Sequence, residues 1–258
     1  MGMPNRSTRS ECGLALRGLV RRLGTALAEA VYPRSCPLCG VASPRPERLI
    51  CWSCFSAFEP YSEGLCEVCG RFAEGGVKHR YLCGACRARR PAFDCARAAC
   101  RFDGALRELL HQFKYQGGIW LRADLVDLLE GCARAHFDVE AVDVVVPVPL
   151  YAARLRERTY NQSGELAAEL AVRLERRFDG TSLRRLRPTA TQTRLSAEAR
   201  RQNVRGAFAV RDGRWIVGRT VMLVDDVMTT GATLEECAAT LKKAGARAVL
   251  AIAVARGS

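Results

Sequence analysis

The segment from Val221 to Gly245 constrains the fold of this 258-residue chain more than any other. It starts with the apolar run VMLV, continues with Asp225 and Asp226, turns through TTGAT, and then has helical spacing in LEECAATLKKAG. A short apolar run of this kind is typical of a central strand in a parallel sheet, buried on both faces. The segment therefore predicts a strand, a tight turn and a helix that Gly245 ends.

The same segment predicts a sugar-phosphate site. Open α/β sheets bind ligands outside the carboxyl ends of their strands, where the two acids are expected. Backbone N–H groups at a helix start suit a phosphate, and the residues expected to supply them are Thr229, Thr230, Gly231, Ala232 and Thr233. Adjacent carboxylates repel each other, and ribose hydroxyls or a cation would relieve this repulsion. An ordinary strand–turn–helix with a capping Asp would account for only one of the acids.

Eight of the thirteen cysteines form four Cys-x-x-Cys pairs within residues 36–86. The halves CPLCG…CWSC and CEVCG…CGAC repeat one another, and Gly40 and Gly70 follow the first pair of each half. Four thiolates per half match structural zinc, which leaves no open position for a substrate. We predict two zinc ions, one held by Cys36, Cys39, Cys51 and Cys54 and the other by Cys66, Cys69, Cys83 and Cys86. Interleaved pairing and disulfides are the alternatives, and His79 is not needed as a ligand.

Arginine dominates the charge of the chain, because lysine supplies only four of the 40 basic residues and the formal charge is +13. This charge favours polyanionic partners such as nucleotides or nucleic acid, and a compositional bias toward arginine is the alternative explanation. Arg154 and Arg158 follow the predicted strand VDVVVPVPL, and Arg200 and Arg201 lie in the polar segment 187–205. We expect that segment to be a mobile loop that closes over an anionic substrate.

Membrane insertion and export are not expected. No apolar run approaches the about 20 residues that span a bilayer, and arginines interrupt the helical pattern within residues 1–33, so it lacks a signal-peptide core. A helix lying on a membrane surface is the alternative for this segment. We predict a cytoplasmic protein, whose reducing surroundings favour metal binding over disulfides.

Strand and helix patterns alternate from about residue 98. This alternation predicts an α/β domain with an open parallel sheet and flanking helices, preceded by a small cysteine-rich zinc domain. The predicted parts are an amino-terminal helix (1–33), the zinc domain (34–92) and the α/β domain (93–258). Strands are expected at 98–102, 142–150, 206–210, 220–226 and 248–255, and helices at 105–115, 123–137, 160–178 and 234–245.

The order of these motifs resembles one bacterial family. VMLVDDVMTTGAT looks like the phosphoribosyl-diphosphate (PRPP) signature of type I phosphoribosyltransferases. Together with the cysteine-rich segment, HQFKYQG, VVPVPLYAARLRERTYNQ and TQTRLSAEARRQNVRGAF, it closely resembles the ComF family over residues 34–255. These are competence-associated, phosphoribosyltransferase-like proteins. They usually have RERGFNQ where this chain has RERTYNQ, so Thr159 and Tyr160 depart from the pattern.

The resemblance implies the type I phosphoribosyltransferase fold and a ligand, PRPP or ribose 5-phosphate, bound with Mg²⁺. Asp225 and Asp226 would bind the ribose hydroxyls, residues 229–233 would wrap the 5′-phosphate, and Arg154 and Arg158 would take pyrophosphate charge. The implied activity is that of a glycosyltransferase that displaces pyrophosphate, with positioning and charge stabilisation as the source of rate.

The catalytic loop and the acceptor site follow from the same resemblance. Arg200 and Arg201 would act from the 187–205 segment. A separate hood, formed by residues near 98–137 and the zinc domain, would select the acceptor. Lys114 and Tyr115 are candidates for this role, but the sequence does not specify the acceptor.

A second implication is a non-catalytic adaptor in DNA uptake that retains the phosphoribosyl site. It would work with DNA-uptake proteins and hold single-stranded DNA by charge and stacking on its zinc domain. The residues that would do so are Arg71, Lys78, Arg80, Arg87, Arg89, Arg90, Trp52, Phe55, Phe72 and Tyr81.

Overall fold

A computed structural model describes residues 35–43, 48–60, 64–73, 81–189 and 196–257. The expected helix within residues 1–33, His79 and the part of the polar segment at 190–195 lie outside these ranges. The chain divides into two compact units, Met1–Cys54 and Phe55–Ser258. Within the described ranges, no helix combines the length and the apolar character that crossing a membrane requires.

The larger unit contains a five-stranded sheet in the order β1-β7-β6-β2-β3. Every pairing in it is parallel, which confirms the predicted α/β class. Residues 221–224 of the central strand are fully buried, as their apolar run predicts. The strands are β1 (Cys95–Arg101), β2 (Val144–Pro147), β3 (Arg177–Phe178), β6 (Thr220–Met228) and β7 (Ala248–Arg256).

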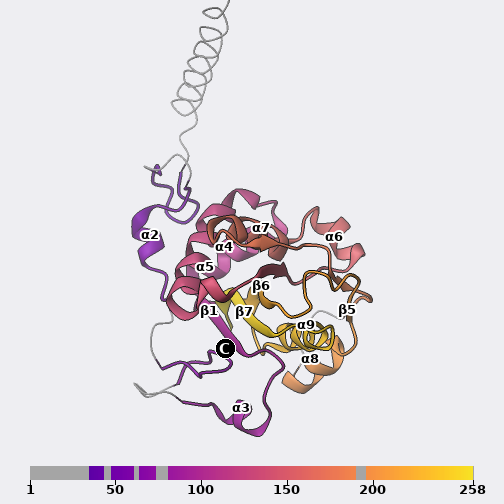
Figure 1. The fold of residues 1–258 in the computed structure, drawn as a ribbon. Coiled ribbons are helices and arrows are strands. Elements are labelled where there is room, and N and C mark those ends of the chain that lie inside the picture. Colours follow the sequence, from indigo (N-terminus) through magenta and orange to yellow (C-terminus); the bar gives the residue numbers. More distant parts are fainter. Residues whose placement is uncertain (1–34, 44–47, 61–63, 74–80, 190–195, 258) are drawn as a thin grey trace, which may run out of the picture. The chain divides into compact units, whose positions relative to one another are not determined.

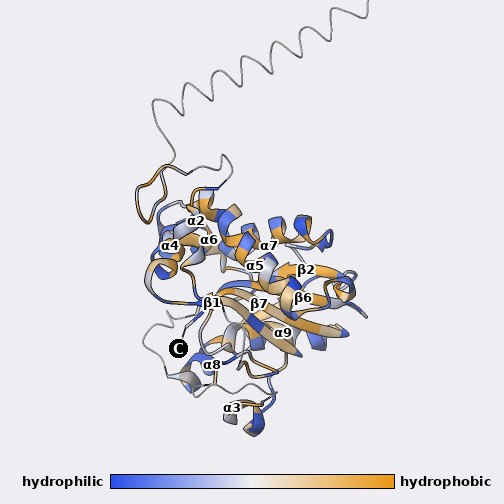
Figure 2. Ribbon diagram, turned by 90° about the vertical axis from the view of Figure 1, so that its left-hand side faces the viewer, coloured by the Kyte–Doolittle hydropathy of each residue, from blue (hydrophilic) through white to orange (hydrophobic). Residues whose placement is uncertain are grey.

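Helices cover both faces of this sheet. α5 (Arg122–His136) and α7 (Gln162–Arg173) pack on one face, with α4 (Gly104–Tyr115) on the same side, and α9 (Ala232–Lys243) packs on the other (Figures 1 and 2). Figure 2 shows apolar residues along β2 and β6, between these layers. The shorter helices are α2 (Trp52–Ser56), α3 (Gly84–Ala88), η1 (Ile119–Leu121), η2 (Val139–Ala141), α6 (Ala152–Arg158) and α8 (Ala197–Val204).

A residue with left-handed backbone follows two of the long helices. Gly245 follows α9 with φ +96°, and its N–H donates to the carbonyl of Lys242 at 3.0 Å, which confirms the predicted stop. Glu175 follows α7 with φ +55°, and β3 begins two residues later. The predicted helix over 160–178 is therefore wrong at its carboxyl end, because a left-handed residue ends a helix and glutamate gives no sequence signal for one.

Two further segments differ from the predictions. The strand expected at 206–210 forms as β5 (Phe208–Val210), but it pairs antiparallel with β4 (Leu183–Arg185) in a separate two-stranded sheet. Three-residue strands carry too little pattern to predict their partners. The expected loop at 187–205 is helical in its second half, where Ser196 caps α8 by accepting a hydrogen bond from the N–H of Ala199 at 3.2 Å. That part of the loop prediction is wrong.

The second cysteine-rich half is built into the larger unit. The N–H of Ala96 on β1 donates to the carbonyl of Val68 at 2.7 Å. Gly70 approaches the same strand so closely that a Cβ there would lie 2.5 Å from the carbonyl oxygen of Ala96. Cys66 and Cys86 are buried in the core shared with the sheet. The second cysteine-rich half therefore belongs to the same compact unit as the α/β domain, although the predicted division between the two domains is at residue 92.

Candidate functional site

The eight paired cysteines form two tetrads. In each tetrad the four Sγ atoms lie within 4.8 Å of one another, and Cys39 and Cys51, like Cys69 and Cys83, have their Sγ atoms 3.6 Å apart. A tetrahedral zinc ion with Zn–S bonds of about 2.3 Å needs sulfur atoms about 3.8 Å apart. The tetrads therefore fit zinc, and the ligands pair sequentially rather than in the interleaved way.

Each tetrad has a backbone turn of the same kind, as the sequence repeat predicts. Gly40 and Gly70 have φ of +73° and +67°, and their N–H groups donate to the carbonyls of Cys36 and Cys66 at 2.8 and 2.9 Å. Burial would raise the pKa of Cys66, but backbone N–H groups, first that of Cys83, outweigh it and lower the pKa to about 6. The backbone thus favours the thiolate at Cys66, whereas burial raises the pKa of Cys69 and of Cys86 in the same tetrad.

The acid pair lies within β6 rather than after it, since the strand continues to Met228. The Oδ1 of Asp225 accepts hydrogen bonds from the Ser163 hydroxyl and from the N–H of Asp226, both at 2.9 Å. Burial of the Asp225 carboxyl, and then the charge of Asp226, raise the pKa of Asp225 to about 7. The expected repulsion between the two acids is thus present in the structure.

A lysine from α4 counters this repulsion. The Nζ of Lys114 lies 2.8 Å from the Oδ2 of Asp226, and the exposed fractions of the two side chains are 20% and 10%. The acid pair therefore has a lysine cation beside it. The sequence pointed to Lys114 only as a candidate for acceptor recognition, because nothing in HQFKY shows which distant carboxylate it meets.

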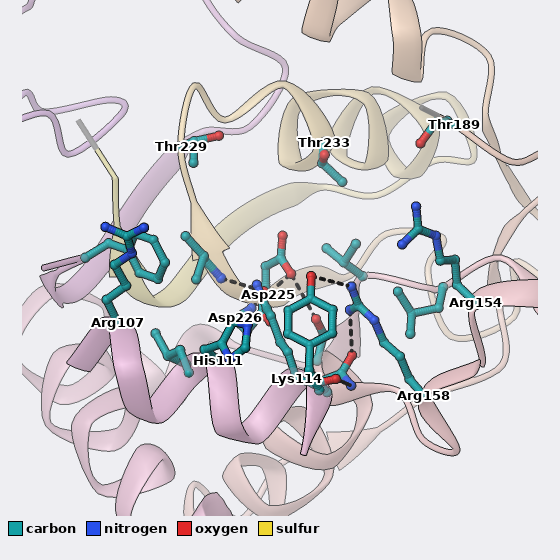
Figure 3. A pocket seen from close by; sticks show the side chains of 18 of the residues that line it. Arg107, His111, Lys114, Arg154, Arg158, Thr189, Asp225, Asp226, Thr229 and Thr233 are labelled. Carbon is teal, nitrogen blue, oxygen red and sulfur yellow. Dashed lines mark hydrogen bonds and ion pairs between the residues drawn. The ribbon is translucent and has the colours of Figure 1, made fainter. Parts of the chain in front are cut away.

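These groups line a cavity of about 840 Å³ (Figure 3). Six of its lining side chains are arginine or lysine, and three are aspartate or glutamate, so the cavity favours anions. Figure 3 shows the α4 side chains on one side of the acids and the turn and α9 on the other. Its labelled residues are Arg107, His111, Lys114, Arg154, Arg158, Thr189, Asp225, Asp226, Thr229 and Thr233.

The turn between β6 and α9 has the shape expected at a helix start. Gly231 immediately precedes α9 with φ +80°, a conformation that glycine adopts without strain. The Oγ1 of Thr230 accepts a hydrogen bond from the N–H of Ala232 at 3.4 Å. Thr229 and Thr233 line the cavity, whereas the other three residues of the turn, all described, lie outside its lining.

Arg154 and Arg158 both line the cavity from α6. The guanidinium of Arg158 donates to Gln162 Oε1 and to Tyr115 Oη, each at 3.1 Å, and lies 4.8 Å from the Tyr115 ring centre. Thr159, where the family usually has glycine, adopts φ +67°. The departure from the family pattern thus leaves Arg158 facing the cavity, with a strained backbone at the next residue.

The two arginines predicted to be catalytic in the polar segment, Arg200 and Arg201, differ in their position relative to the cavity. Arg200 lines the cavity, but Arg201 does not; it pairs with Glu198 at 3.1 Å and Glu235 at 3.9 Å. The catalytic role of Arg201 stays a prediction.

Arg185 and Ser163 are among the lining residues that the sequence analysis did not single out. Arg185 enters the cavity from β4, and its buried Nε has no hydrogen-bond partner among the described residues. Burial lowers its pKa. Ser163 holds Asp225 from α7. Neither residue stands in a motif, so only the fold could reveal them.

Comparison with known proteins defines the class. Residues 27–87 match the double zinc ribbon domain and residues 161–258 match the phosphoribosyl transferase domain. The chain is thus a double zinc ribbon joined to a phosphoribosyltransferase domain, with the fold that the resemblance implied.

Relatives narrow this class to one family. Competence protein F of Haemophilus influenzae is 33% identical over 196 residues, which are 74% of this chain and 84% of the relative. DNA utilization protein YhgH of Escherichia coli (strain K12) is 32% identical over 216 residues, 78% of this chain and 93% of the relative. Competence protein ComFC of Bacillus subtilis is 24% identical, with coverages of 78% and 81%. This chain belongs to the ComF family.

Solved structures show a more distant likeness. Glutamine PRPP amidotransferase from B. subtilis, complexed with ADP and GMP, is 21% identical with a TM-score of 0.37, over 55% of this chain and 30% of that one. PRPP synthetase from Mycobacterium smegmatis is 20% identical with a TM-score of 0.32, over 51% and 33%. The matched part of this chain spans about a third of each.

Proposed function

We propose that the cavity binds PRPP or ribose 5-phosphate with Mg²⁺. The observation that carries this proposal is that an acid pair, a helix start and several arginines face one cavity of about 840 Å³. The start of α9 suits the 5′-phosphate, and Asp225 and Asp226 suit the ribose 2′- and 3′-hydroxyls. Arg154 and Arg158 suit the pyrophosphate. The carboxylates, with the ligand's phosphates, are oxygen donors of the kind Mg²⁺ takes, and a bound ion would neutralise the leaving group.

We further propose a phosphoribosyl transfer. An acceptor atom bonds to the anomeric carbon as the bond to pyrophosphate breaks, pyrophosphate leaves with the electron pair, and the acceptor gives up a proton. No protein nucleophile is needed, because orientation and fixed charge supply the rate. Arg185 and Arg200 line the same cavity and would stabilise the developing negative charge.

In this proposal α4 forms the acceptor wall. Arg107, His111, Lys114 and Tyr115 are spaced so that they share one face of the helix, and all four line the cavity. The acceptor itself is to be found by a screen of nucleobases with PRPP.

The test is calorimetry with PRPP and Mg²⁺ on the wild type, Asp225→Asn and Asp226→Asn, with Asp212→Asn as a control on a carboxylate that pairs with Arg214 outside the cavity lining. We expect at least about a tenfold loss of affinity in each site variant, because each loses a charged hydrogen-bond acceptor, and no change in the control. Equal affinity in all four proteins would rule out the site.

A nucleic-acid-binding adaptor is the second candidate. The names of the relatives refer to competence and DNA utilization. Phe72 on the second ribbon is 38% exposed, and the guanidinium of Arg101 lies 5.1 Å from its ring centre, an arrangement on which a base can stack. Lys78 and Arg80, which were expected to help, lie outside the described residues. We place the protein in the cytoplasm, where a reducing environment favours zinc thiolates.

Single-stranded DNA binding measured against salt tests this candidate. The affinity for single-stranded DNA should fall steeply as the salt concentration rises. At a fixed salt concentration it should be lower for Phe72→Ala than for the wild type. Phe178→Ala is the matched control, because Phe178 is 40% exposed on β3, at the opposite edge of the sheet from β1. A flat salt response, or equal losses in both variants, would exclude the ribbon as the DNA site.

A further inference from the structure

A buried arginine connects the second zinc tetrad to the turn before α9. The Nη1 of Arg256, at the end of β7, donates to the carbonyl of Cys69 at 2.6 Å and lies 3.5 Å from the Sδ of Met228. Arg256 and Met228 are 6% and 2% exposed. Met228 ends β6 directly before Thr229, and its carbonyl accepts a hydrogen bond from the N–H of Gly257 at 3.0 Å. One guanidinium thus contacts both a zinc ligand's carbonyl and the residue that precedes the turn.

A second contact reaches the other side of the turn. Arg89, which follows the helix carrying Cys86, places its Nη2 2.6 Å from the Oε1 of Glu235 in the first turn of α9. The N–H of Glu235 donates to the carbonyl of Gly231 at 2.8 Å. Because the Arg89 side chain is 56% exposed, this ion pair is the weaker of the two connections. Together they hold residues 229–233 at both ends.

The ribbon is itself fixed to β1, so these contacts have a rigid base. Arg97 donates from Nη1 to the carbonyl of Cys66 at 3.3 Å and from Nη2 to that of Glu67 at 3.2 Å. The backbone bond between Ala96 and Val68 runs alongside them. The first tetrad belongs to the other compact unit, Met1–Cys54, and provides a control within the same chain.

We infer that the second zinc site positions the turn at residues 229–233, and that loss of this zinc, but not of the first, loosens the turn and weakens phosphoribosyl binding. A zinc ion bound to the Sγ of Cys69 would hold the carbonyl of the same residue in place. Without that bond the carbonyl moves, and Arg256 loses an acceptor for a buried charge. The effect on ligand affinity rests on the proposed function, whereas the effect on the turn does not.

Hydrogen exchange of the ligand-free protein tests the effect on the turn. Cys86→Ser and Cys54→Ser, the last ligands of the two tetrads, should each lower the zinc content from two ions to one. We expect amides at 229–235 to exchange about tenfold faster in Cys86→Ser, as for the loss of a hydrogen bond to a charged group, and unchanged in Cys54→Ser. Amides of α7 report on global folding and should match the wild type in both. Equal exchange at 229–235 in the two variants would overturn the inference.

Arg256→Met carries the test if Cys86→Ser does not fold. It should keep both zinc ions and still accelerate exchange at 229–235 about tenfold. Arg256→Lys should restore most of the protection, because an ammonium can still donate to the Cys69 carbonyl; a general structural defect would not be rescued in this way. Wild-type exchange in Arg256→Met, or no rescue by lysine, would refute a positioning role.

Calorimetry with PRPP and Mg²⁺, the test of the proposed function, then measures the effect on ligand affinity. Arg256→Met should bind about tenfold more weakly than the wild type, a change of about 1.4 kcal/mol. If the wild type does not bind, the proposed function fails while the exchange result still decides the role of the zinc site. If the turn loosens and the affinity stays the same, the second half of the inference is wrong.

Discussion

Lys114→Met should destabilise the protein even though the lysine lies in a cavity. Its Nζ is 2.8 Å from Asp226, and the two side chains are only 20% and 10% exposed. The substitution keeps most of the apolar length of the side chain and removes the charge. It leaves Asp226 beside Asp225 without the cation that pairs with it.

The size of the loss follows from the geometry. Two unit charges at this separation attract by about 6 kcal/mol at an effective dielectric constant of about 20. Desolvation of the two charges offsets several kcal/mol of this attraction. We therefore expect Lys114→Met to lower the free energy of unfolding by about 2–3 kcal/mol at neutral pH.

Urea denaturation of four proteins measures this loss: the wild type, Lys114→Met, Asp226→Asn and the double variant. Each single variant leaves a charge unpaired, whereas the double variant removes both. The double variant should therefore lie within about 1 kcal/mol of the wild type. If its loss equals the sum of the single losses, the ion pair does not carry the stability and the reasoning is refuted.

Three further perturbations have defined outcomes. Thr159→Gly should raise the free energy of unfolding in urea by about 0.5–1 kcal/mol, because glycine adopts φ +67° without strain. Asp179 has a lowered pKa, since hydrogen bonds from Ser182 and nearby N–H groups outweigh the effect of burial. Its stabilisation is therefore complete above about pH 4 and lost as the pH falls further, and Asp179→Asn should flatten this part of a stability–pH curve. Gly70→Ala should lower the thermal midpoint more than Gly40→Ala, because both residues have positive φ but only at Gly70 would a Cβ meet backbone, at 2.5 Å.

Each of these outcomes has a clear opposite. A loss of stability in Thr159→Gly would mean that the left-handed residue is not strained. A wild-type acid profile in Asp179→Asn would assign the acid sensitivity to other carboxylates. Equal midpoints for the two glycine variants would mean that the ribbon does not press on β1.

Patterns local to the chain were enough to predict β6, the turn and α9. Apolar continuity, two acids and a glycine at the helix start each reflect a backbone requirement that acts within a few residues. The same holds for the zinc tetrads, because Cys-x-x-Cys spacing and a following glycine specify the metal turn. Errors arose where a local rule was broken or the pattern was short, as at Glu175 and in β5.

Contacts between distant residues could be known only from the folded chain. Lys114 meets Asp226 because α4 packs beside the carboxyl end of β6, and Arg256 meets Cys69, 187 residues earlier, because β7 and the second ribbon flank the same strand. No residue type or spacing encodes such pairings, since sheet order and helix packing bring the partners together. The motifs were enough to predict the chemistry of the proposed site. Its charge balance and its connection to the second zinc tetrad depend on the three-dimensional arrangement.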